Sequence, residues 1–201
     1  MISPLVKPED IEAVSRQMGS FWIGRGSKVA LLEEVMADWV SAKRCVVFGS
    51  GTAALVVAMR SMRQAFIDYP KDVCDAFFFA ANAAKVGHGR GPKVTIYPDV
   101  SGDIVDFARH LPVRKEHKLE AAYGIFSFGA LKDVSGGIGG AIVSDHPIYA
   151  DDMKRISPLS DINAVMVLSQ LKRYRGHLPL RLVADGKTWS REHKHVDWHP
   201  V

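Results

Sequence analysis

Cysteine and long apolar runs are both scarce in this chain. Its 201 residues include only two cysteines, Cys45 and Cys74, which are too few for a disulfide framework and lie in apolar surroundings. No apolar stretch approaches the length of a membrane-spanning helix, and the first residues lack an apolar signal core. These absences predict a cytoplasmic protein with no membrane partner, placed in the host cytoplasm if the source is viral.

Several familiar motifs are also missing. The chain has neither a Walker loop nor the glycine spacing of a dinucleotide-binding turn, and it contains no internal repeat or low-complexity segment. Hydrophobic residues make up 47% and charged residues 24%, which is typical of a globular protein. We therefore expect one domain over residues 1–201, with residues 1–25 as a lead-in and residues 185–201 as a basic tail containing His and Trp.

Positive charge is concentrated in the last third of the chain. The formal net charge is +4, and the stretches QLKRYRGHLPLR and KTWSREHKHVDWHP place Lys, Arg and His beside Tyr and Trp. Such a region is either a solvated basic surface or a surface for a polyanion, where aromatic rings stack on bases. No nucleic-acid motif is present to decide between the two. The His-rich tail is read as solvated, and no metal site is predicted.

Strands and helices alternate along the sequence. Apolar residues at helical spacing predict a helix over 29–40, and a β-branched strand over 45–48 follows, with a helix from Ala53 onwards. Further strands are predicted at 92–100, 123–129 and 139–145, and a helix at 161–176. This order indicates an α/β fold, a three-layer α/β/α sandwich.

The turn Gly49–Thr52 joins a strand to a helix. Such a turn presents free backbone N–H groups at a helix N-terminus, where the dipole favours an anion. Ser50 and Thr52 add hydroxyl groups, and Gly51 lets the backbone come close to a ligand. A phosphate site and a purely structural turn with an N-capping Thr52 are both compatible with this pattern.

Lys132 lies between an aromatic-serine-aromatic tripeptide and a glycine-rich run, in residues 126–143 (FSFGALKDVSGGIGGAIV). A lysine that forms a Schiff base must be positioned, partly desolvated and flanked by tolerant backbone. Ser127, at the end of the preceding strand, could offer its hydroxyl to the same ligand. A solvated surface lysine is the alternative.

Four collinear blocks covering most of residues 20–184 resemble the DegT/DnrJ/EryC1/StrS group of pyridoxal-phosphate enzymes. They are WIGRGSKVALLEEVMADWVSAKRCVVFGSGTAALVVAM, FFFAANAAKVGHGRGPKVTIYPDVSGDIVDF, SFGALKDVSGGIGGAIVSD and DINAVMVLSQLKRYRGHLPLRLVA. The resemblance implies the large domain of the aspartate-aminotransferase fold (fold type I) in minimal form, with pyridoxal 5'-phosphate as cofactor. It also implies a homodimer with shared active sites.

The resemblance assigns roles to individual residues. Lys132 matches the lysine that holds the cofactor as a Schiff base. Gly51 and Thr52, with Ser50 beside them, match the phosphate-binding turn, and Ser127 matches the serine that also holds the phosphate. In the run Phe77-Phe78-Phe79, Phe77 matches the aromatic ring that stacks on the cofactor, and the other two are expected in the core.

The chain also departs from this family. Family members carry an aspartate that pairs with the pyridine nitrogen; here the stretch Leu119–Ala122 (LEAA) only echoes its motif, so Glu120 is the nominated acid. Ile138 replaces an acidic residue between the glycines of the lysine loop. The small C-terminal domain that closes over substrate is not found. Arg25, Arg175 and Arg181 are the candidates for a group that binds a substrate carboxylate.

These departures leave three functions open. Without the pyridine acid, a one-way reaction such as decarboxylation is easier to support than transamination, and an open site suits a bulky substrate. The main hypothesis is therefore decarboxylation of an amino-acid-modified base of DNA, as in phages. The alternatives are a shortened sugar or small-molecule aminotransferase, and a non-catalytic scaffold.

Overall fold

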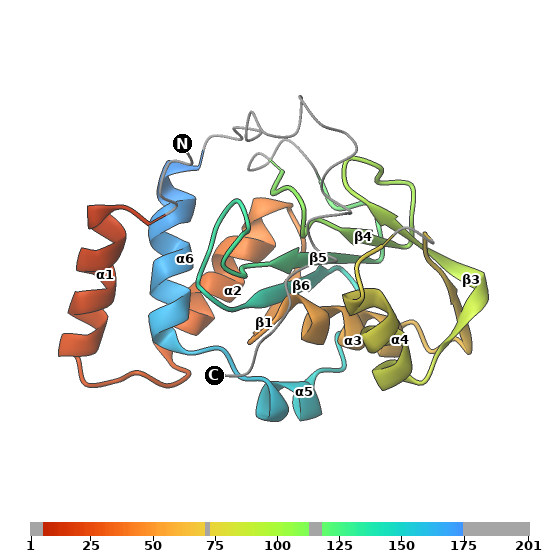
Figure 1. Ribbon diagram of the computed structural model, residues 1–201, viewed down its shortest axis with the longest axis horizontal. Helices are drawn as coiled ribbons and strands as arrows, with labels where there is room; N and C mark the ends of the chain where they lie inside the picture. The colour runs from red at the N-terminus through yellow and green to blue at the C-terminus, as the bar shows by residue number, and fades with distance from the viewer. Residues whose placement is uncertain (1–5, 71–72, 113–117, 175–201) are drawn as a thin grey trace, which may run out of the picture.

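The computed structural model describes residues 6–70, 73–112 and 118–174, and it is built on a six-stranded sheet (Figure 1). The strands lie in the order β1-β6-β5-β4-β3-β2. β6 is antiparallel to both of its neighbours, and every other neighbouring pair is parallel. The carboxyl ends of β1, β4 and β5 therefore lie on the same edge. The strands are β1 (Arg44–Phe48), β2 (Phe66–Asp68), β3 (Gly87–Ile96), β4 (Ile104–Asp106), β5 (Tyr123–Ser127) and β6 (Gly140–Ser144).

Helices cover both faces of the sheet, which confirms the predicted three-layer arrangement. α2 (Ser27–Trp39) and α6 (Asp161–Arg173) pack on one face, in a core that includes Phe126 and Val143. α3 (Gly51–Ser61) and α4 (Ala76–Ala84) pack on the other face, in a core that includes Ile125 and Ile142. Adjacent residues of β5 and β6 thus face opposite layers, as the two-residue period of a strand requires. The short helix α5 (Asp151–Ile156) follows β6.

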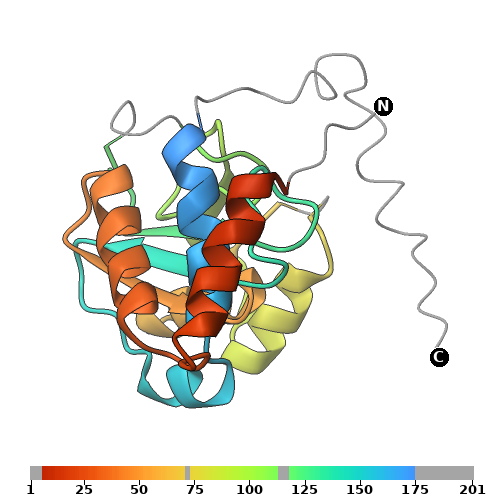
Figure 2. The same cartoon turned by 90° about the vertical axis from the view of Figure 1, so that its left-hand side faces the viewer.

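The predicted lead-in, residues 1–25, contains a helix that packs against the rest of the protein. α1 (Pro8–Gly19) lies along the outer side of α6, while α2 lies on the other side of α6 (Figure 2). The Asp10 side chain is fully buried, and its Oδ1 accepts a hydrogen bond of 2.6 Å from the Arg173 guanidinium. This ion pair, with hydrogen bonding from Lys7, holds the pKa of Asp10 below its ordinary value despite burial.

The start of α2 is fixed by a residue distant in sequence. The buried Asp161 carboxylate, at the first position of α6, accepts hydrogen bonds from the backbone N–H groups of Gly26 (2.8 Å) and Val29 (2.9 Å). These donors lie at the N-terminus of α2, where N–H groups have no partner within the helix. Asp161 therefore replaces a local N-cap and ties the two helices together.

The sheet becomes thin towards β2. β4 was not expected from the sequence, and residues 97–103 alone connect the parallel strands β3 and β4. Between β4 and β5 the described residues contain no helix. Parallel neighbours are usually joined by a longer crossover that carries a helix, so this end lacks part of the usual outer layer. In the part of the chain that is described, no helix is long and apolar enough to span a membrane.

Candidate functional site

An open pocket of about 240 Å³ lies at the carboxyl ends of β1, β4 and β5. In sheets of this kind, ligands bind beyond the carboxyl ends of the strands. The pocket brings together all the residues predicted to bind the cofactor, and it adds Asp106, whereas Glu120 and Arg25 do not line it. The predicted residues that line it are Ser50, Gly51, Thr52, Phe77, Ser127 and Lys132.

The N-terminus of α3 forms one wall of the pocket. Ser50 is the N-cap: its Oγ accepts a hydrogen bond of 3.1 Å from the N–H of Ala53. The structural alternative named Thr52 as the cap, and this is wrong, because Thr52 lies in the first turn of the helix. The Ser50 hydroxyl can still donate its hydrogen, as can that of Thr52. Both hydroxyls, with the first N–H groups of the helix, are available to an anion.

Close backbone approach explains the glycines of this wall. A Cβ on Gly51 would lie 3.0 Å from the Cβ of Ser127 and 3.3 Å from the carbonyl oxygen of Phe126. A Cβ on Gly140 would lie 2.4 Å from the Cα of Gly51. Glycine at 51 and 140 therefore lets Ser127 and the start of β6 reach the N-terminus of α3. A single β-bridge between Ser50 and Gly139 continues this contact.

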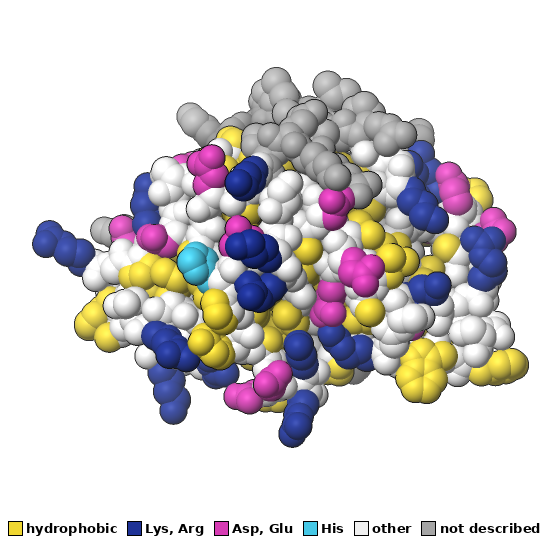
Figure 3. Space-filling view, turned by 180° about the vertical axis from the view of Figure 1, so that it is seen from behind, with side chains coloured by type: hydrophobic (Ala, Val, Ile, Leu, Met, Phe, Trp, Pro, Cys, Tyr) yellow, Lys and Arg dark blue, Asp and Glu magenta, His cyan; other side chains and the backbone are white. Residues whose placement is uncertain are grey.

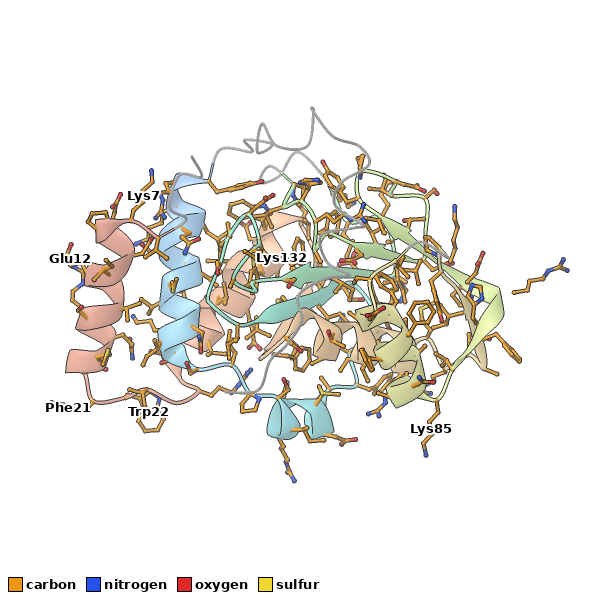
Figure 4. All side chains as sticks on the ribbon, viewed as in Figure 1. Lys7, Glu12, Phe21, Trp22, Lys85 and Lys132 are labelled. Carbon is orange, nitrogen blue, oxygen red and sulfur yellow. The ribbon has the colours of Figure 1, made fainter. Side chains whose placement is uncertain are left out.

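Lys132 lies in the loop between β5 and β6, which we call the Lys132 loop (residues 128–139). Its N–H donates to the carbonyl of Gly129 at 3.1 Å, and the side chain is half-buried against the pocket (Figure 4). Gly137 and Gly139 have φ of +79° and +137°, a region that favours glycine. Lys132 therefore lies in a defined turn and lines the pocket, and its role stays a prediction.

Asp106 is the functional candidate that sequence reasoning missed. It ends β4, is 8% exposed, and lines the pocket together with Lys132. Burial raises the pKa of its carboxyl to about 6, against the lowering effects of a hydrogen bond from the N–H of Ala108 (2.7 Å) and of the Lys132 charge. A buried acid with a raised pKa in a pocket is a typical feature of a functional site.

The nomination of Glu120 is not supported by the structure. Its side chain is exposed, outside the pocket, and it precedes β5, whose far end carries Ser127. The LEAA echo was misleading because it matched letters without a strand that leads into the pocket. The useful signal was DIVDF, where an aspartate closes a short apolar run.

The three phenylalanines of α4 do not divide as expected. Phe77 is 2% exposed and lines the pocket, whereas Phe78 and Phe79 are exposed rather than core residues. The rings of both Phe77 and Phe78 contact Tyr69, at 6.1 Å and 5.8 Å between ring centroids, but only Phe77 of the three is buried. Its predicted stacking role remains a prediction. Ile138 also lines the pocket and is exposed at its mouth.

Of the three candidate carboxylate-binding arginines, only Arg25 is described, and it is engaged elsewhere. Its guanidinium donates to Glu33 Oε1 at 2.6 Å and to the carbonyl of Val47 at 3.3 Å, and it does not line the pocket. Arg175 and Arg181 lie outside the described residues.

Most of the predicted basic region, including the whole tail 185–201, also lies outside the described residues. On the face of the described body shown in Figure 3, Lys and Arg side chains are interspersed with acidic ones and form no single stripe. Among the residues that the structure places, no group of His, Cys, Asp or Glu could hold a metal ion.

The pocket therefore has a clear chemical character. It combines a primary amine (Lys132), a buried carboxyl (Asp106), the Ser50–Thr52 turn at a helix N-terminus and an aromatic ring (Phe77). These groups fit a ligand that carries a phosphate, a carbonyl for the amine, and a cationic ring atom for the carboxylate.

A model of the DegT/DnrJ/EryC1/StrS aminotransferase family matches residues 4–92. Over 58 residues the chain is 38% identical to the spore coat polysaccharide biosynthesis protein SpsC of Bacillus subtilis, a match that spans 29% of this chain and 15% of SpsC. Among solved structures, it is similar to PseC of Helicobacter pylori, an aminotransferase involved in pseudoaminic acid biosynthesis. That similarity has a TM-score of 0.71 at 19% identity.

Two further structures have the same fold. They are the PLP-form of Spr1654 from Streptococcus pneumoniae, a putative sugar aminotransferase in its structure's own title (TM-score 0.69, 15% identity), and NtdA of B. subtilis with bound cofactor PMP (TM-score 0.69, 12% identity). Each similarity, that to PseC included, covers 84% of this chain, but only 64%, 65% and 54% of PseC, Spr1654 and NtdA. The predicted resemblance is therefore confirmed: over residues 4–92 the chain is similar to the DegT/DnrJ/EryC1/StrS aminotransferase family, and it has the fold of these solved structures while spanning about two thirds of their length or less.

Proposed function

We propose that this protein is a pyridoxal 5'-phosphate-dependent aminotransferase that transfers an amino group to a carbonyl-bearing sugar-type substrate. The observation that carries the proposal is that Lys132, Asp106 and the N-terminus of α3 line one pocket. The sugar class is supported by the names of the relatives, which concern polysaccharide and pseudoaminic acid biosynthesis.

The anion-binding turn would hold the cofactor phosphate. The first N–H groups of α3 and the hydroxyls of Ser50, Thr52 and Ser127 converge on this wall, where the helix dipole also favours negative charge. Gly51 keeps Ser127 close enough to take part. A Cβ at this position would push the Ser127 side chain away from the turn.

Lys132 would serve as the covalent anchor and as the group that moves a proton. When bound, pyridoxal phosphate supplies a conjugated ring that accepts electrons from the substrate's reacting carbon. The half-buried Lys132 amine, once free of the cofactor, is placed to take a proton from that carbon and return it. The Lys132 loop restricts the lysine to the pocket through its hydrogen bond to Gly129.

Asp106 would hold the ring nitrogen in its protonated state. The carboxylate is destabilised by burial, as its raised pKa shows, and a cationic partner would offset this cost. The hydrogen bond from Ala108 fixes the orientation of the carboxyl group. This acid removes the reason for preferring decarboxylation, which rested on the absence of a pyridine partner. The comparisons likewise favour the aminotransferase alternative over a DNA-base decarboxylase.

A second copy of the chain is the partner that the pocket mouth suits. Leu131 and Ile138, both in the Lys132 loop, are 69% and 54% exposed. Ile138 lines the pocket and Leu131 directly precedes Lys132, and exposed apolar side chains of this kind are stabilised when another surface covers them. We therefore propose a homodimer in which each copy helps to close the other's pocket. Sedimentation equilibrium tests this, and a monomer at micromolar concentration would contradict it.

The deciding experiment adds pyridoxal phosphate to the purified protein and records the Schiff-base absorbance band. Borohydride reduction followed by peptide mass spectrometry should place the label on Lys132, and Lys132→Ala should lose it. Lys85→Ala is the matched control, because Lys85 is exposed and points away from the body (Figure 4). Adding glutamate should abolish the band. A band that persists in Lys132→Ala, or none in the wild type, would contradict the proposal.

A further inference from the structure

The Lys132 loop is fastened to α6 along one side of that helix. The amide nitrogen of Asn163 donates to the carbonyl of Gly136 at 2.8 Å. About two turns further along the same face of α6, Gln170 both accepts a hydrogen bond from the N–H of Ser135 (2.9 Å) and donates one to the carbonyl of Ser135 (2.7 Å). These contacts fix the second half of the loop, after Lys132. None of these contacts involves Lys132 or the residues directly beside it.

Asp133, the residue directly after Lys132, makes contacts of its own. Its Oδ2 accepts a hydrogen bond of 3.1 Å from the N–H of Leu111 and lies 3.3 Å from the hydroxyl of Tyr174, at the end of α6. Nδ1 of His110 is 3.8 Å from the same oxygen, and among the described residues this buried nitrogen has no hydrogen-bond partner. One carboxylate oxygen of the Lys132 loop therefore lies close to two other segments, residues 110–111 and the end of α6.

The contacts differ in strength. Tyr174 has a single hydroxyl hydrogen, and its oxygen lies only 2.6 Å from the carbonyl of Leu111, which can only accept. The hydrogen therefore points to Leu111, and the N–H of Leu111 is the firm donor to Asp133. Burial raises the pKa of the Asp133 carboxyl, whereas this N–H and the nearby His110 lower it. The hydrogen bond from the N–H of Leu111 to Asp133 therefore does not depend on His110.

The segment reached in this way also carries Asp106. Residues 106–111 run from the end of β4 to Leu111, so the bond between Asp133 and Leu111 joins the Lys132 loop to the segment that bears the buried pocket acid. We propose that Asp133 is a positioning residue: its carboxylate ties the Lys132 loop to the Asp106 segment through the N–H of Leu111, and so holds the Lys132 amine at the pocket. This deepens the proposed function and rests on it only for the consequence in catalysis.

The test measures Lys132 in the absence and in the presence of cofactor. Without cofactor, acylation of Lys132 by a limiting amount of acetic anhydride is followed by peptide mass spectrometry, with exposed Lys85 as internal reference. In Asp133→Ala, Lys132 should react about three-fold faster relative to Lys85, since one hydrogen bond that holds it is gone. With saturating pyridoxal phosphate, the borohydride-trapped fraction should fall about ten-fold. All measurements are made well below each variant's unfolding midpoint.

Two variants separate positioning from loss of structure. Asp133→Asn keeps an oxygen that accepts from Leu111, so its Lys132 reactivity should stay within about two-fold of the wild type. Asp145→Ala is the matched control, because Asp145 also accepts a backbone hydrogen bond, from Lys43 at 2.8 Å, on a different part of the surface. If Asp133→Ala does not fold, Asp133→Ser replaces it, because its shorter side chain cannot reach the N–H of Leu111, and it should raise Lys132 reactivity in the same direction.

The outcomes are distinct. Unchanged Lys132 reactivity in Asp133→Ala, or in Asp133→Ser where the first variant does not fold, overturns the positioning role. So does an Asp133→Asn variant as reactive as Asp133→Ala. If the wild type is never trapped by borohydride but the acylation pattern holds, the proposed function fails while the positioning role stands.

Discussion

At the β1 end of the sheet, β1, β5 and β6 are five residues long, and β6 pairs with β1 over five residues and with β5 over four, whereas at the β2 end β2 and β4 have three residues each. Helices α2, α3 and α6 cover the first end, and the described residues provide no crossover helix between β3, β4 and β5 at the second. The pocket lies where the two meet. Lys132 and the turn before α3 belong to the β1 end, which we call the thick end, and Asp106 belongs to the β2 end, which we call the thin end.

This division shows what a shortened fold has to keep. The Ser50–Thr52 turn and the start of β6 depend on close backbone contacts, which the packed layers at the thick end hold in place. Asp106 needs only a short buried strand between β3 and β5 to bring its carboxyl to the pocket. The outer helices of the thin end can therefore be reduced without removing the acid.

The largest effect is expected from adding one methyl group at the thick end. In Gly140→Ala the new Cβ would lie 2.4 Å from backbone atoms of Gly51, which cannot move without opening the sheet. We expect a loss of about 3 kcal/mol or more in unfolding free energy. Gly89→Ala at the thin end, where the Cβ meets only the Phe66 ring at 3.2 Å, should cost much less. Urea titration measures both, and equal losses would contradict the difference between the ends.

The second prediction concerns Asp106 and pH. Its folded pKa, about 6, lies above the ordinary value of 3.8, so between these pH values the folded state holds a proton that the unfolded state has lost. The unfolding free energy of the protein without cofactor should therefore fall as pH rises from about 4 to 6, by up to about 3 kcal/mol. Asp106→Asn should remove this fall and be the more stable protein at pH 7.

The control for this comparison is built into the same variant. With pyridoxal phosphate present, Asp106→Asn should bind the cofactor more weakly than the wild type even though it is the more stable protein. A difference between the two proteins in unfolding free energy that does not change between pH 4 and 7 would show that Asp106 is not destabilised by burial.

A smaller loss is expected from Asp161→Ala, which removes the shared cap of α2. Two buried backbone donors, on Gly26 and Val29, would lose their acceptor, so the unfolding free energy should fall by about 2 kcal/mol. Asp103→Ala, at the thin end, removes an exposed acceptor for the N–H of Lys93 and should cost about 0.5 kcal/mol. Thermal unfolding of both variants checks the order, and the reverse order would contradict it.

The smallest perturbation is a chemical label. Cys74 is exposed and lines the pocket, whereas burial and the Glu33 carboxylate raise the pKa of the Cys45 thiol. Iodoacetamide at pH 7.5 should modify Cys74 first, and pyridoxal phosphate should slow that reaction. Preferential labelling of Cys45, or no protection of Cys74 by a cofactor that is shown to bind, would place the ligand elsewhere.

The sequence predicted the thick end well. The helix at 29–40, the strand at 45–48 and the two strands around Lys132 have strong periodicity, and the structure places them as α2, β1, β5 and β6. Lys132, Ser127 and the turn at 50–52 could be found because each lies beside such an element.

The thin end could not be predicted in the same way. A three-residue strand such as Ile104–Asp106 has no measurable periodicity, and only its pairing with β3 and β5 defines it. Asp106 was therefore overlooked, and Glu120 was chosen from a similarity of letters. The contacts of Asp133 could not be predicted for a related reason, because Leu111 and Tyr174 lie far from it in the sequence.

The reversed direction of β6 has a consequence for the order in which the pocket is completed. β5 and β6 are close in sequence, so the Lys132 loop is a local structure that can form quickly. β1 also pairs with β6, but the paired residues, such as Arg44 and Ser144, are far apart in the sequence. The Ser50–Thr52 turn, which follows β1, comes close to Lys132 only after this long-range pairing. If the pairing forms after the rate-limiting step, bound cofactor should slow unfolding and leave the refolding rate almost unchanged.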